Sequence, residues 1–168
     1  MSGYKVFFII IIILIILLYL QSYMKPRNDY NIIQVYLDNF KLDNLYEKYP
    51  IVIYDQIYNI DDLLNTIFKY SYAFKKLLQI ETAKIYKNTH KYLLIFNNIN
   101  PIKLKLINPK YKKDIKMKFE DSNVEYVTIK LKEKQVVILP ALWYYYSDDK
   151  NISAIGLDDL ISGTVYAL

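Results

Sequence analysis

The first pattern along the chain is an unbroken apolar run near its start. Every residue from 6 to 20 is apolar or Tyr, and of the 19 residues between Lys5 and Lys25 all but two are apolar or aromatic. At about 1.5 Å per residue these positions would extend roughly 28 Å as a helix, close to the ~30 Å hydrocarbon core of a bilayer. The pattern therefore predicts a retained single-pass transmembrane anchor, a signal anchor, over residues 1–25.

Two other interpretations of this run fit less well. A cleaved signal peptide ends in small residues of the Ala-x-Ala type, whereas this run ends in Leu-Tyr-Leu-Gln-Ser-Tyr. A helix packed on the core of a small domain would keep a polar face, and the run has none. The basic residues on its two sides balance, so the sequence does not predict which side of the membrane the rest of the chain occupies.

Residues 26–168 are predicted to form one soluble domain with more strand than helix. Helices are expected at 42–48, at 60–78 and at 157–161, the second because its apolar residues share one helical face behind Asn59, an N-cap residue. Strands are expected where β-branched and aromatic residues cluster or alternate, at 32–37, 51–54, 92–96, 102–106, 124–131, 136–139, 142–146 and 152–155. Helices followed by antiparallel-type strands predict an α+β fold, β-rich and partly closed into a barrel.

Composition narrows the classes of partner and of chemistry. The chain of 168 residues is rich in Tyr, Ile, Lys and Asn and holds one Arg, a bias towards residues with A/T-rich codons that indicates an AT-rich genome. A net charge of +5 would fit a nucleic-acid partner, but Arg makes the commonest specific base contact, so nucleic acid is disfavoured. The absence of Cys excludes disulfides, thiolate chemistry and Cys-ligated zinc.

The titratable residues offer no catalytic constellation. The single His, His90, lies in a polar turn among cationic neighbours, where we expect it to be exposed, and one His cannot form a two-His metal site. Carboxylates occur as adjacent residues whose side chains diverge, so they are interpreted as helix starts or turns rather than as acid–base pairs. The pairs expected at helix starts are Asp61-Asp62 and Asp158-Asp159, and the pair expected in a turn is Asp148-Asp149.

Two segments are candidate contact surfaces. One is rich in lysine and suits an anionic surface, although a solvated face would give the same pattern. The other is an aromatic run suited to a protein partner or a sugar, although a strand alternating between core and surface would also explain it. The lysines are Lys103, Lys105, Lys110, Lys112, Lys113, Lys116 and Lys118, and the aromatic residues are Trp143, Tyr144, Tyr145 and Tyr146.

Two stretches resemble the jumonji-type, cupin-fold hydroxylases. Residues 32–54, IIQVYLDNFKLDNLYEKYPIVIY, resemble their opening strand, short helix and "Pro-Val-Val-Ile" strand, and residues 124–146, VEYVTIKLKEKQVVILPALWYYY, resemble their closing strands with a "Pro-x-Gly-Trp-Trp-His" segment. The resemblance implies Fe(II) and 2-oxoglutarate in active members, held by a His-x-Asp/Glu pair and a distal His. This chain has no His-x-Asp/Glu, and if Leu142 and Trp143 stand for the tryptophan pair, Tyr144 replaces the distal His. We therefore expect a degenerate cupin-like domain without metal or cofactor.

The apolar N-terminus and the AT-rich composition also resemble anchored proteins of large DNA viruses. Together these features predict a membrane-anchored, non-catalytic structural or adaptor protein in a virion membrane or an internal host membrane. Its expected partners are the lipid bilayer and a protein, either another copy or a shell protein. The alternatives are an atypical Fe(II)/2-oxoglutarate oxygenase or another enzyme, and a sugar- or nucleic-acid-binding module. The sequence does not decide whether the glycosylation sequon at Asn151 is used.

Overall fold

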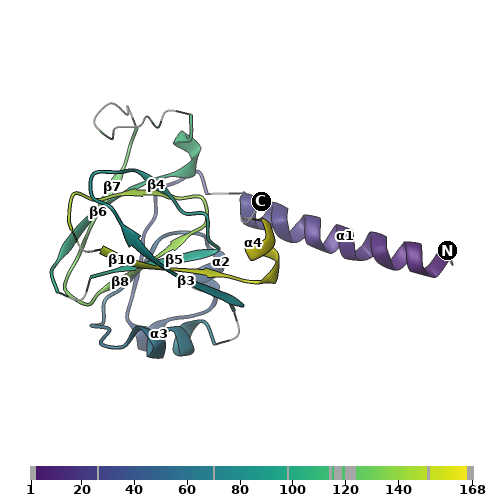
Figure 1. The fold of residues 1–168 in the computed structure, drawn as a ribbon, viewed down its shortest axis with the longest axis horizontal. Coiled ribbons are helices and arrows are strands. Elements are labelled where there is room, and N and C mark those ends of the chain that lie inside the picture. The colour runs from purple at the N-terminus through teal and green to yellow at the C-terminus, as the bar shows by residue number, and fades with distance from the viewer. Residues whose placement is uncertain are drawn as a thin grey trace.

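A computed structural model describes residues 3–165, apart from residues 26, 70, 98, 114, 116–118, 120–123 and 151. Helix α1 (Gly3–Met24) projects from a domain built of two β-sheets, with the C-terminal helix α4 (Leu160–Val165) beside its inner end (Figure 1). The described part of the chain thus contains both sheets and helices, and the predicted α+β class is confirmed. Lys116, Lys118 and Asn151, which the sequence singled out, lie outside the described residues.

The larger sheet has six strands in the order β1-β2-β8-β5-β10-β3. Their bounds are β1 (Ile33–Val35), β2 (Ile51–Ile53), β8 (Val136–Pro140), β5 (Tyr92–Phe96), β10 (Ile152–Asp158) and β3 (Phe74–Ile80). Among the described strands of this sheet, β1 and β2 pair in parallel and the other neighbours pair antiparallel. The smaller sheet has the order β4-β9-β6-β7, all antiparallel: β4 (Tyr86–Lys87), β9 (Tyr144–Tyr146), β6 (Ile102–Ile107) and β7 (Val127–Leu131).

Apolar side chains fill the space between the two sheets. One cluster joins residues of the larger sheet, such as Leu93 and Ile95, to residues of the smaller one, such as Leu104 and Leu106, all at most 1% exposed. Because strand side chains alternate in direction, the other residues of the larger sheet face outward. Helix α3 (Ile60–Ile67) covers that outer face in a second cluster, helped by the short helix α2 (Asp43–Tyr46).

The predicted helix over residues 60–78 is wrong in its second half. Helix α3 ends at Ile67, and residues 74–80 form strand β3, which pairs with β10 along its whole length. Phe74 and Leu78, four residues apart, share a helical face but also share a strand face, because four is a multiple of the strand period of two. The apolar spacing therefore fitted both structures, and pairing with β10 decided between them. Other expected elements are confirmed within a few residues, among them α2 and the strands near 92–96 and 102–106.

The predicted transmembrane anchor is contradicted. Helix α1 spans Gly3–Met24, but within the described residues no helix is long and apolar enough to cross a membrane. The expectations of a single-pass protein, a signal anchor and a membrane location are corrected accordingly.

Candidate functional site

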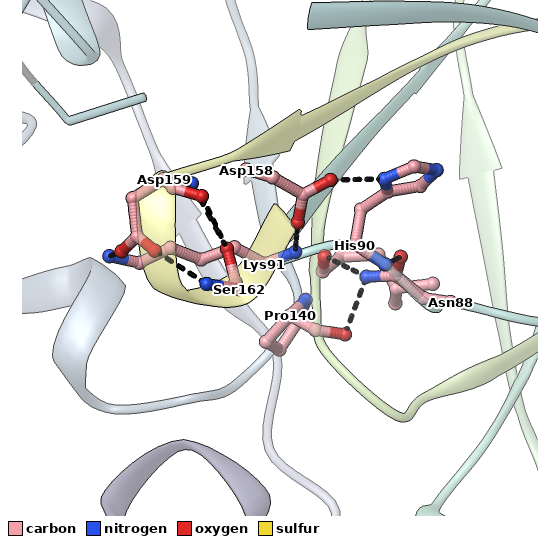
Figure 2. A network of polar contacts seen from close by, with 8 residues as sticks. Asn88, His90, Lys91, Pro140, Asp158, Asp159 and Ser162 are labelled. Atoms are coloured by element: carbon pink, nitrogen blue, oxygen red, sulfur yellow. Dashed lines mark hydrogen bonds and ion pairs between the residues drawn. The ribbon is translucent and has the colours of Figure 1, made fainter. Parts of the chain in front are cut away.

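A network of polar side chains gathers where the turn after β4 meets the end of β10 (Figure 2). Its base is Asn88, which is 1% exposed and whose side-chain amide donates to the carbonyl oxygens of Leu139 and Pro140, each at 2.9 Å. The Asn88 Oδ1 accepts from the backbone N–H of His90 at 2.8 Å. A buried polar side chain satisfied in this way fixes the turn on β8.

His90 is held in one orientation by contacts on two sides. Its Nδ1 lies 2.5 Å from Asp158 Oδ2, while Asp158 Oδ1 accepts from the backbone N–H of Lys91 at 2.8 Å. The face of the imidazole lies against Gly156, where an added Cβ would come within 2.4 Å of the ring. The expectation that His90 is an exposed loop residue is therefore wrong, since its side chain is only 15% exposed. Asp158 lies 68 residues away in sequence, so no local pattern could reveal the pair.

The adjacent acid, Asp159, joins α1 and α4 to this centre. Its Oδ1 accepts from the backbone N–H groups of Ile161 and Ser162 at 3.0 and 2.8 Å, which caps α4, and its Oδ2 pairs with Lys91 Nζ at 2.7 Å. The hydroxyl of Tyr19 in α1 also donates to Asp159. Burial raises the pKa of Asp159, but these hydrogen bonds and the Lys91 charge outweigh it and lower the pKa to about 2. The expected helix start at Asp158-Asp159 is confirmed for Asp159.

Two neighbouring clefts open beside His90. One, of about 220 Å³, lies between β3 and the turn after β4 and is lined by Lys76, Gln79, Tyr86, Thr89 and His90 among others. The other, of about 380 Å³, shares Lys76, Thr89 and His90 and continues to Asp158 and α4. Nδ1 faces the Asp158 carboxylate, which favours a proton on that nitrogen, and Nε2 points away from Asp158 (Figure 2). This is an oriented imidazole, but within the described residues no hydroxyl nucleophile is hydrogen-bonded to it.

The aromatic run at β9 lies mostly inside the domain. Trp143, Tyr145 and Tyr146 are 1%, 4% and 4% exposed, and only Tyr144 is half-buried. Tyr145 stacks on Tyr86 of the neighbouring strand with ring centroids 5.5 Å apart. Burial raises the pKa of the Tyr144 and Tyr145 phenols. The prediction of a four-residue partner platform is therefore corrected, because three of its members are core residues.

The lysine-rich segment divides into exposed residues and one enclosed residue. Lys105, on β6, is half-buried, with its Nζ 4.4, 5.0 and 5.7 Å from the ring centroids of Phe119, Tyr146 and Tyr126. Asp148 lies 3.8 Å from the same Nζ. Four other lysines of the segment are exposed: Lys103, Lys110, Lys112 and Lys113. Lys105 is thus an internal contact, and the remaining lysines keep their interpretation as surface charges.

The other two predicted carboxylate pairs, Asp61-Asp62 and Asp148-Asp149, have the structural roles expected of them. Asn59 caps α3 by accepting from the backbone N–H of Asp61 at 3.0 Å, with Asp62 following in the first turn. Asp148 accepts from the hydroxyl of Tyr146, and Asp149 accepts from the backbone N–H of Lys103 at 2.5 Å. In the described part of the chain, His, Asp and Glu nowhere gather in a group of three or more that could hold a metal. The described residues therefore do not offer the ligand set for Fe(II) that the resemblance implies.

A scan against protein-family models finds no match to this chain, and a search of curated proteins finds no relative.

Proposed function

We propose that this chain is a non-catalytic structural or adaptor protein whose two-sheet domain is a degenerate cupin-like fold. The packing between the sheets carries the proposal. In a cupin-type enzyme the cofactor sits between the sheets, whereas here that space holds aliphatic residues and the Tyr86–Tyr145 stack. A domain filled in this way acts through its surface rather than through a reaction inside it.

The order of the strands supports the cupin-like part of the proposal. From β3 to β10, consecutive strands pass to the opposite sheet at each step except the β6–β7 hairpin. Eight strands divided between two facing sheets and connected in this way form a jelly roll. Cupins share this arrangement with viral capsid and lectin domains. Strands β1 and β2 extend the larger sheet beyond β8.

The backbone at Leu142 refines which residues stand at the resembling positions. Leu142 has φ +72°, a left-handed conformation that favours glycine. This supports aligning Leu142 with the glycine of the "Pro-x-Gly-Trp-Trp-His" pattern, an alignment in which Trp143 and Tyr144 take the tryptophan places. The distal His is then replaced by Tyr145 rather than by Tyr144. A buried, protonated phenol stacked on a second tyrosine is a packing group, not an Fe(II) ligand.

Helix α1 supports a role that depends on neighbours. Its described side chains from residue 4 to residue 18 are exposed and apolar except for Lys5, on all sides of the helix. Contiguous apolar patches of this size are rare on isolated proteins and mark contact sites. The domain also fixes the inner end of α1, because Lys48 Nζ donates to the carbonyl oxygens of Ser22 and Lys25 while Tyr19 donates to Asp159. The helix is thus held in a set direction for a neighbour to cover.

An enzyme is the second candidate, and the oriented His90 favours it. An imidazole with Nδ1 on a carboxylate, on a residue that lines a cleft, is an arrangement suited to a general base. The His90→Gln variant separates the two functions. An enzyme would lose its activity in this variant, whereas a structural protein would keep its neighbours.

Crosslinking of the full-length chain in its native source, followed by mass spectrometry, tests the structural proposal. We expect one constant protein neighbour, joined through lysines of the two-sheet domain, with wild-type chain and with His90→Gln. A chain without any constant neighbour would contradict the structural role and favour the enzyme.

A further inference from the structure

Strand β3 forms one edge of the six-stranded sheet. Its seven residues pair with β10 on one side, and in the described part of the chain no strand pairs with its other side. Phe74 and Leu77 on this strand are 50% and 69% exposed. A long edge strand with exposed apolar side chains is a template for a further strand.

We propose that two copies of this chain associate by pairing their β3 strands antiparallel about a two-fold axis at Leu77. This inference rests on the proposed structural role and names the partner as a second copy. Backbone N–H and C=O groups on the free edge would supply the hydrogen bonds, and a two-fold contact needs only one self-complementary segment.

The sequence of β3 is self-complementary in this register. With Leu77 opposite its own copy, Phe74 faces Ile80, Lys75 faces Gln79 and Lys76 faces Leu78. All seven residues are paired, and no charge lies directly opposite a like charge. An axis at Lys76 would instead place two lysines face to face, which is destabilising.

Strand β3 carries two lysines, and lysine on an edge strand usually discourages pairing with another strand. Lys75 forms an ion pair with Asp61 at the start of α3, so its charge is already balanced within the chain. Lys76 lies opposite Gly156 of β10 and lines both clefts beside His90. The charge of Lys75 is therefore balanced within its own chain, and Lys76 lies on the opposite face of the strand from Leu77. Leu77 is left as the exposed centre of the edge.

Single-cysteine variants of the full-length chain test the pairing directly, because the natural sequence has no Cys. Residues opposite each other on antiparallel strands have Cα atoms roughly 4.5–5.5 Å apart, within the ~4.4–6.8 Å that a disulfide spans. Leu77→Cys should therefore give a disulfide-linked dimer under mild oxidation. The matched control is Lys75→Cys, which is also exposed but would lie four residues from its own copy, roughly 13 Å away. It should give at least tenfold less dimer, and mixing it with Gln79→Cys should restore the crosslink.

Each outcome of this test decides the proposal. Equal crosslinking of Leu77→Cys and Lys75→Cys would indicate random collision and overturn it, as would the absence of dimer from both Leu77→Cys and the Lys75→Cys/Gln79→Cys mixture. Fluorescence of the single Trp, Trp143, checks that each variant is folded. If the disulfides fail while crosslinking in the native source still finds a constant neighbour, the structural role stands with a different partner. If no constant neighbour is found either, both proposals fail.

Discussion

Placing a methyl group under the His90 ring tests the polar centre quantitatively. In Gly156→Ala the new Cβ would lie 2.4 Å from the imidazole, so the ring must move away and its bond to Asp158 must lengthen or break. Overpacking a filled site costs about 1–3 kcal/mol, and a hydrogen bond to a charged group contributes about 1.5–3 kcal/mol. Since the ring can relax in part, we expect Gly156→Ala to lower the free energy of unfolding by about 2–4 kcal/mol.

The His90→Ala variant shows whether the ring is the cause. By itself, His90→Ala should lower the free energy of unfolding by about 2–3 kcal/mol, because Asp158 loses a buried partner. In the double variant the methyl group added by Gly156→Ala occupies space that the ring has left, so its cost should nearly vanish. The two substitutions should then be non-additive by nearly the whole cost of Gly156→Ala, about 2–4 kcal/mol.

The assay is urea unfolding of the full-length chain in a mild detergent that covers α1, followed by fluorescence of Trp143, which is 1% exposed. Gly163→Ala is the matched control, since its Cβ would meet the ring of Phe74 at 2.7 Å and not His90. Gly163→Ala and His90→Ala should add. If Gly156→Ala and His90→Ala also add to within ~0.5 kcal/mol, the close packing of His90 on Gly156 is refuted.

Three further predictions concern single residues. Asn88→Ala should lower the free energy of unfolding by about 1–3 kcal/mol in urea, because it removes the buried donor that the Asn88 amide supplies to the carbonyl oxygens of Leu139 and Pro140. Asp159→Asn keeps an α4 cap but loses the ion pair with Lys91. In this partly exposed site the loss should lower the free energy of unfolding by about 1 kcal/mol. Because the folded-state pKa of Asp159 is depressed from 3.8 to about 2, this contribution is present above pH 3.8 and should fade as the pH falls towards about 2; a difference between wild type and variant that does not change over this range would contradict the ion pair. Lys105→Met should lower the free energy of unfolding by about 0.5–2 kcal/mol in thermal unfolding, because the cation–aromatic contacts are lost. A variant as stable as wild type would show that the lysine is solvated instead.

Strands could be predicted from the sequence where the local pattern of apolar residues matched the burial of the strand in the fold. Residues 92–96 and 102–106 are apolar or alternating, and both form strands in the filled interior. Strand β3 was missed because its exposed residues Lys75, Lys76 and Leu77 are consecutive and lie on both faces of the strand, which gives no clean alternation, and because its apolar spacing also fits a helix. The two-residue strand β4 is too short to leave any periodic signal.

Almost none of the candidate site could be predicted from local sequence patterns. His90 was judged from its cationic neighbours in the turn, whereas the β10 strand brings Asp158 and Gly156 against it. The aromatic run was recognised as unusual, but its role as core follows from the pairing of β9 with β4 and β6, which no single segment encodes. The apolar run at the N-terminus did form a helix, α1, but among the described residues no helix is long and apolar enough to cross a membrane.

Metal analysis of the purified full-length chain tests most directly whether the domain works by contact rather than by reaction. The chain would be loaded anaerobically with Fe(II), and separately with Zn(II), then desalted and measured by mass spectrometry of the metal. The filled interior predicts no stoichiometric metal, and the same background in wild type and in His90→Ala. One equivalent of metal per chain, lost in His90→Ala while Trp143 fluorescence shows an intact fold, would contradict the account and make the enzyme the leading proposal.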